Sequence, residues 1–394
     1  MSRQSAKDRK PPKEKPCKEA QTAPKKPVDP RYERLPIWCY VLLGIALLAL
    51  VIYLIAALCV GFAEWFNRTV GAAMRASLAF LTSWLPFSLS EILILSVPVL
   101  LVLLSIYAYR KRCETWKSVF VFMGCILSAF SVLFSLFVFS FGAGYHTAPL
   151  EQRLGYEAVN VDESSLYETS LWLVEELNAA ADGIQYAENG FSVMPYDRKT
   201  MNAHLIAAYR PVCEAYPFVQ RMNSRVKPVL VSRLMSYTHI TGVYTYFTGE
   251  ANINVDFPDY TLPYTAAHEL AHQRGIAREN EANFVAFLVT AASSDAYVRY
   301  SGYLNLFEYV STALYYENAE RYKEVVGLLD PRVLEELRAF SDFFDTYRNA
   351  AIAELSGAVN DAHIKLNGDK AGIDSYGLVV DLAVAYCARY EKTA

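Results

Sequence analysis

The chain has 394 residues, of which 53% are hydrophobic, and its formal net charge at pH 7 is −4. The hydrophobic share is high for a soluble protein. Residues 144–394 hold 20 basic and 33 acidic residues, which excludes a nucleic-acid-binding domain because such a domain needs a basic face.

The first 34 residues form a basic, proline-rich segment. They hold eleven Lys and Arg residues against five Asp and Glu residues. A segment of this composition cannot bury enough apolar surface to fold. We therefore predict that residues 1–34 are a disordered tail, and that no specific nucleic-acid role is needed to explain their charge.

Three uncharged stretches follow, at residues 35–63, 92–109 and 118–145. Each is at least 18 residues long and apolar on all sides, unlike a half-buried helix, which has a polar face. Buried core helices are the less favoured alternative. We predict a membrane domain over residues 35–145, with transmembrane helices at about 37–63, 91–109 and 118–143. The uncharged segment 76–90, which contains Pro86, is expected to lie at the membrane interface or to be re-entrant.

The connections between these stretches differ in charge. The loop Arg110–Lys117 carries four basic residues and one acidic residue, whereas the connection Glu64–Glu91 has only two basic residues. Because basic segments stay in the cytoplasm, we expect a multi-pass plasma-membrane protein whose N-terminus is cytoplasmic. Residues 146–394 would then form an extracytoplasmic domain.

This C-terminal domain is expected to be α+β and mostly α. Residues 163–181 and 197–216 have helical patterns, and residues 227–257 are rich in β-branched and aromatic residues, which predicts a small sheet of two or three strands. From Pro263 onward the pattern is largely helical. Cys213 and Cys387 are the only cysteines in this domain, and they could form a disulfide or remain buried thiols.

The segment "HELAHQRG" begins at His268. On a helix, residues four apart share a face, so His268 and His272 can both bind one Zn²⁺ ion. Glu269 lies to the side, where it can act as the general base towards a water activated by the metal. This motif is the candidate active site.

A catalytic zinc usually has three protein ligands, and a carboxylate is the natural third one here. On the next helix, Glu281 shares its face with Phe284 and Leu288, whereas Glu279 lies on a more polar stripe. A buried carboxylate is costly unless it is paired or bound to a cation. We therefore predict Glu281 as the third zinc ligand and Glu279 as a solvated charge.

These residues also carry a resemblance to known families. "HELAH" followed by "NEA" resembles the glutamate-zincin (gluzincin) peptidases. The longer run "TGVYTYFTGEANINVDFPDYTLPYTAAHELAHQRGIARENEANFVAFL", with "GYHTAPLEQRLG" before it and "DSYGLVVDLAVAY" after it, is similar to a bacterial membrane-protein family, domain of unknown function 3810. The resemblance implies a zincin-like zinc peptidase domain.

The resemblance also implies a substrate-binding strand upstream of the metal helix. In gluzincins an edge strand holds an extended peptide by strand addition, and "GEANINV" fits that element. Substrate-binding residues are therefore expected at Gly249, Glu250, Ala251 and Asn252. The sequence leaves the residue that stabilises the oxyanion unassigned among several candidates, which are His239, Tyr244, Arg299, Tyr300 and Tyr303.

The expected function is a membrane-anchored zinc peptidase that hydrolyses peptide bonds of an envelope or other extracytoplasmic protein or peptide. The alternative is a catalytically inactive zincin-fold receptor or scaffold that binds an envelope partner. An intramembrane peptidase is disfavoured because Gln273, Arg274 and Arg278 flank the motif and are too polar for lipid. The oligomeric state and the identity of the substrate are left open.

Overall fold

A computed structural model describes residues 34–111, 115–157, 159–348, 354, 358 and 376–391. The predicted tail lies outside these residues except for Arg34.

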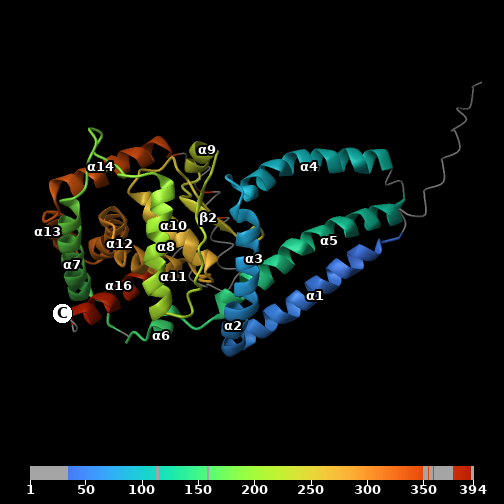
Figure 1. Ribbon diagram of the computed structural model, residues 1–394, viewed down its shortest axis with the longest axis horizontal. Helices are drawn as coiled ribbons and strands as arrows, with labels where there is room; N and C mark the ends of the chain where they lie inside the picture. The colour runs from blue at the N-terminus through green and yellow to red at the C-terminus, as the bar shows by residue number, and fades with distance from the viewer. Residues whose placement is uncertain are drawn as a thin grey trace, which may run out of the picture.

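Three helices are long and apolar enough to cross a membrane. They are α1 (Ile37–Leu58), α4 (Leu89–Lys111, with the apolar part Leu89–Ala108) and α5 (Trp116–Ser140). Helices α1 and α5 run side by side, whereas α4 diverges from them (Figure 1). The three predicted apolar helices are confirmed, and their length and composition indicate a multi-pass membrane protein. Helix α1 ends before residue 63 because Cys59 adopts an extended backbone conformation.

Short helices join the membrane helices to the rest of the chain. Between α1 and α4 lie α2 (Val60–Phe66), the π-helix η2 (Asn67–Gly71) and α3 (Ala72–Ser83). After α5 come the 3₁₀ helix η3 (Gly142–His146) and α6 (Leu150–Leu154). Helix α3 stands between the membrane helices and the C-terminal helices (Figure 1). The segment predicted to be interfacial includes much of α3, and α3 contacts strand β3 (Glu250–Ile253) of the C-terminal domain.

Arg75 of α3 ties these parts together. Its side chain is fully buried, and it donates hydrogen bonds to Asn67, to the carbonyl of Ser140 at 2.7 Å and to Gln220 at 3.3 Å. Burial lowers the pKa of Arg75 to about 10, so the guanidinium is still charged at neutral pH. Asn67 in turn donates to the carbonyl of Gly275 at 2.9 Å, so one buried cluster links α3, the end of α5 and the C-terminal domain.

The C-terminal domain is mostly helical, as predicted. The helical patterns predicted at residues 163–181 and 197–216 correspond to the first two helices in the list that follows. Its helices are α7 (Glu163–Ala181), α8 (Arg198–Ala215), α9 (Ser232–Ser236), α10 (Thr261–Gln273), α11 (Glu279–Ala291), α12 (Ala296–Glu317), α13 (Ala319–Val326), α14 (Pro331–Thr346) and α16 (Tyr376–Glu391). Cys213 and Cys387 are buried and are not joined by a disulfide.

The predicted small sheet has three strands in the order β1-β3-β2. The strands are β1 (Lys227–Pro228), β2 (Gly242–Thr245) and β3 (Glu250–Ile253). Strand β3 is parallel to β1 and antiparallel to β2, with Val243 opposite Asn252. Helix α10 packs against β2 and β3 and also contacts α11 and α12. Every residue of α10 is therefore buried except His268, which is partly exposed.

Candidate metal centre

His268 and His272 lie one turn apart on α10, and their imidazoles meet. The two Nε2 atoms are 3.0 Å apart, and the ring planes are nearly perpendicular. Nδ1 of His272 lies 2.8 Å from the carbonyl oxygen of Ile276. A carbonyl can only accept, so Nδ1 carries a proton, and in the neutral ring the lone pair is then on Nε2. This is the tautomer and the fixed orientation that a metal-binding histidine requires.

Glu279, the first residue of α11, completes a group of three. Its Oε2 lies 3.2 Å from Nε2 of His268 and 3.4 Å from Nε2 of His272. In a tetrahedral zinc site with bonds of about 2.0–2.1 Å, two ligand atoms are about 3.3 Å apart. The residues present therefore fit a zinc-sized ion, and they form the one such group among the described residues.

The charges of this group support one another. Burial acts to lower the pKa of His272, but the nearby carboxylate of Glu279 raises it to about 9. Burial acts to raise the pKa of Glu279, but His272 and His268 hold it well below its usual range. Without a metal, the ionised carboxylate thus pairs with a protonated His272. With the Nε2 proton displaced by a metal ion, the three side chains would be the donor set of the His₂Glu class of zinc sites.

The structure does not bring Glu281, the predicted third ligand, to the histidines, and Glu279 takes that place. Glu281 is buried, as its helical face indicated, but its carboxylate forms ion pairs with Arg153 and, at 2.6 Å, with Arg278. Two guanidinium groups therefore stabilise the buried charge in place of a metal. The side chain of Glu279 is about one-third exposed, and it is this carboxylate that turns toward the imidazoles.

Glu269 is buried beside the histidines and lies directly against strand β2. A Cβ atom on Gly242 would come within 2.6 Å of Oε1 and 2.7 Å of Cγ of Glu269. Only glycine leaves room for the carboxylate at this position. Oε2 is buried and has no hydrogen-bond partner among the described residues. Burial raises the pKa of Glu269 to about 7, although His268, His272 and the backbone amide of Tyr244 act in the opposite direction.

The strand expected to bind substrate is not an edge strand: it is the central strand of the sheet that the described residues form. Strand β3 lies between β1 and β2, so both of its backbone edges are already paired. Ala251 is fully buried, and Asn252 donates to Ser90 at 3.2 Å. The edge that lies beside Glu269 belongs to β2 instead.

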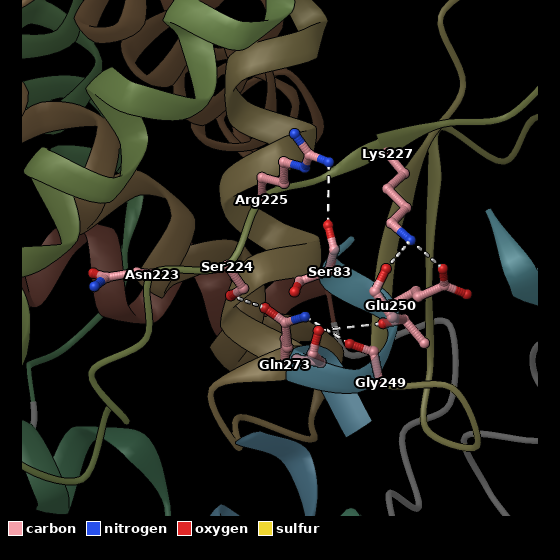
Figure 2. A pocket seen from close by; sticks show the side chains of 10 residues that line it. Ser83, Asn223, Ser224, Arg225, Lys227, Gly249, Glu250 and Gln273 are labelled. Atoms are coloured by element: carbon pink, nitrogen blue, oxygen red, sulfur yellow. Dashed lines mark hydrogen bonds and ion pairs between the residues drawn. The ribbon is translucent and has the colours of Figure 1, made fainter. Parts of the chain in front are cut away.

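Glu250 and Gly249 hold the membrane part against the sheet. The carboxylate of Glu250 pairs with Lys227 at 2.6 Å and accepts hydrogen bonds from the first amides of α4, those of Leu89 and Ser90. Negative charge at a helix N-terminus is stabilising. Gly249 has a positive φ of 68°, and its carbonyl accepts from Gln273 at 2.6 Å (Figure 2). Gly249 and Glu250 line a small cavity next to α3. They make structural contacts there and do not form an open backbone edge for a peptide.

The candidates for oxyanion stabilisation are distributed over the domain. Tyr244 of β2 lies beside the centre, with its ring stacked 6.5 Å from that of His272. Tyr300 donates to Glu336, and His239 lies beside the carbonyl of Tyr347. Arg299 donates to the carbonyl of Ser293. Tyr303 packs its ring among Trp172 and Phe287.

Comparison with known proteins supplies a family but no activity. No curated protein and no solved structure matches the chain. The family model described as protein of unknown function (DUF3810) matches residues 66–384. That match includes α3, the last two membrane helices, the sheet and all the residues of the centre. The chain therefore belongs to the DUF3810 family of proteins of unknown function.

Proposed function

We propose that this protein is a zinc-dependent peptidase. The observation that carries the proposal is the triangle of His268, His272 and Glu279, with edges that fit a tetrahedral zinc site, beside the buried carboxylate of Glu269. Three protein ligands leave a fourth position open for water or substrate, which distinguishes catalytic from structural zinc sites. A zinc ion bound there would polarise a water molecule and the carbonyl group of a substrate.

Each residue of the centre has a task in hydrolysis. Glu269 accepts one proton from the attacking water, whose oxygen forms a bond to the carbonyl carbon. Glu269 then delivers this proton to the leaving nitrogen as the C–N bond breaks. The contact of His272 with the carbonyl of Ile276 fixes the ring, so that Nε2 points to the metal position. Gly242 gives the carboxylate of Glu269 the space that it needs.

The edge of β2 is the proposed docking site for the substrate backbone. Within the part of the chain that the structure describes, strand β2 pairs with β3 on one side only, and Glu269 lies against Gly242 at its first residue. An extended peptide that pairs with a sheet edge gains main-chain hydrogen bonds without any demand on its sequence. A peptide in this position passes the open side of the metal centre.

The test is hydrolysis by the full-length protein and by the Glu269→Gln variant. The purified protein, loaded with zinc in detergent or nanodiscs, is expected to cleave an unstructured protein such as casein. Glu269→Gln is expected to lower the rate by about 10²–10⁴-fold while its zinc content stays unchanged. Equal rates for the two proteins would refute the proposal. Zinc binding without any cleavage that depends on Glu269 would favour the alternative, an inactive receptor or scaffold.

We further propose that the C-terminal domain lies outside the cytoplasm, because the tail and the loop Arg110–Lys117 are basic. The test uses cysteine labelling of intact cells with an impermeant maleimide, after replacement of the exposed Cys59 by serine. A cysteine introduced at Glu320, whose side chain is 79% exposed, is expected to react at once. The native Cys17 in the tail is expected to react only after permeabilisation. The opposite labelling pattern would show that the C-terminal domain lies in the cytoplasm.

A further inference from the structure

The metal centre lies at the very end of a membrane-spanning helix. Helix α5 ends at Ser140, and the ring of the next residue, Phe141, lies 5.8 Å from that of His272 in an edge-to-face contact. Three residues further on, a Cβ atom on Gly144 would come within 2.9 Å of Cβ of Ala277, in the loop between the two ligand-bearing helices. The end of the membrane-spanning helix α5 therefore contacts the metal centre directly, with no linker segment between them.

The turn that joins β2 to β3 rests on the same membrane helix. The ring of Tyr246 lies 5.3 Å from that of Phe137, which is inside the span. The hydroxyl of Ser140 donates to the carbonyl of Tyr246 at 3.4 Å. At the other end of the turn, a Cβ atom on Gly249 would come within 2.6 Å of Leu78 on α3. One end of strand β2 thus leads straight to the membrane helices.

Exposed apolar side chains mark the level of the bilayer surface. Phe80 and Trp84, in α3 and directly after it, are 77% and 75% exposed, and Trp65 on α2 is 55% exposed. Leu230 is 74% exposed, and its backbone amide donates to Glu91 near the start of α4. Tryptophan is enriched at membrane–water interfaces. The face formed by α2, α3 and Leu230 is therefore expected to sit in the headgroup region.

Strand β2 is short, so the metal centre lies close to the headgroup region of the bilayer. It has four residues, which corresponds to about 13 Å of extended chain. Gly242 at its first residue touches Glu269, and Thr245 at its last residue enters the turn that contacts α5. A peptide bound along β2 thus has one end directed at the bilayer and reaches it within a few residues.

The limited exposure of the metal centre also restricts the shape of substrate that can reach it. His272 and Glu269 are buried, and among the ligands only His268 and Glu279 have exposed surface. An extended chain can reach such a site, whereas the surface of a folded globular protein cannot.

We propose that the substrate is a membrane-anchored polypeptide, cut in an extended segment within about five residues of the bilayer surface on the side of the C-terminal domain. This inference rests on the proposed peptidase function. Anchoring both partners in one bilayer raises their effective concentration, and the position of the centre fixes the cut close to the anchor.

The test uses full-length protein reconstituted in phospholipid vesicles with a pool of reporters. Each reporter has one apolar spanning helix of about 20 residues, a randomised segment of about twelve residues and a fluorescent tag on the side of the C-terminal domain. A second pool carries a Gly/Ser spacer of about fifteen residues between helix and randomised segment. A third pool has no helix. Tag release and the sequence of the new ends are measured for wild type and Glu269→Gln.

The first pool is expected to be cut at least about tenfold faster than the other two, with new ends within about five residues of the helix. Equal cutting of all three pools, or cutting of the helix-free pool alone, would overturn the inference and leave the peptidase proposal standing. Absence of any Glu269-dependent cutting, of these pools and of casein alike, would overturn the peptidase proposal and this inference with it.

Discussion

Zinc binding is expected to be lost in Glu279→Ala and kept in Glu281→Gln. The carboxylate of Glu279 lies 3.2 and 3.4 Å from the two imidazole nitrogens, whereas that of Glu281 is occupied by Arg153 and Arg278. Removal of Glu279 leaves two histidine ligands, too few for a catalytic zinc site. Metal analysis of the full-length protein, purified in detergent, measures the stoichiometry directly.

Glu281→Gln is expected to lower stability instead of zinc content. The substitution removes a buried negative charge and leaves two guanidinium groups unpaired, a change that costs about 3–5 kcal/mol. Thermal unfolding measures this loss. Should the variant fail to fold, Glu281→Gln combined with Arg153→Met removes the more buried arginine as well. Full zinc content in Glu279→Ala, or zinc loss in a folded Glu281 variant, would restore Glu281 as the ligand.

Gly242→Ala is expected to abolish most activity while zinc content stays the same. The new Cβ would lie 2.6 Å from Oε1 of Glu269, so either the carboxylate or strand β2 must move. A displacement of about 1 Å in a reacting group can cost about 100-fold in rate. None of the three ligands needs to move, so metal analysis should give the wild-type value.

The matched control for this substitution is Gly183→Ala. A Cβ atom at Gly183 would meet its nearest atom at 4.0 Å, so the same chemical change creates no clash there. The control is expected to keep wild-type activity and zinc content. Wild-type activity in Gly242→Ala would show that Glu269 does not act from the position described.

The sequence predicts those parts of the structure that depend on local patterns. The membrane helices follow from long uncharged stretches, and helix α7 begins where Asp162 and Ser165 cap each other. The pairing of His268 with His272 follows from the helical repeat alone. The mostly helical domain with a small mixed sheet follows from the change of residue type after residue 227.

The rest of the site depends on contacts between distant segments. The burial of Glu281 is predicted correctly from its helical face, but one of the two arginines that neutralise it, Arg153, lies 128 residues earlier. No local pattern reveals Arg153, whereas Arg278 stands only three residues before Glu281 and forms an i,i+3 pair that our sequence prediction did not take into account. In the same way, β3 is a central strand because Lys227 and Pro228 pair with it. These two residues lie outside the segment "GEANINV", so that segment alone does not reveal the pairing.

The buried cluster around Arg75 has a practical consequence for anyone who wants to produce the C-terminal part as a soluble fragment. A fragment that starts at residue 146 would lack Arg75, Asn67 and the end of α5, and these residues cover the loop after α10 and the backbone around Gly275. It would also lack Leu89 and Ser90, whose amides satisfy the carboxylate of Glu250. The boundary between the membrane helices and the C-terminal domain, which is visible in the hydrophobicity of the sequence, is therefore not a place where we expect the protein to be divisible.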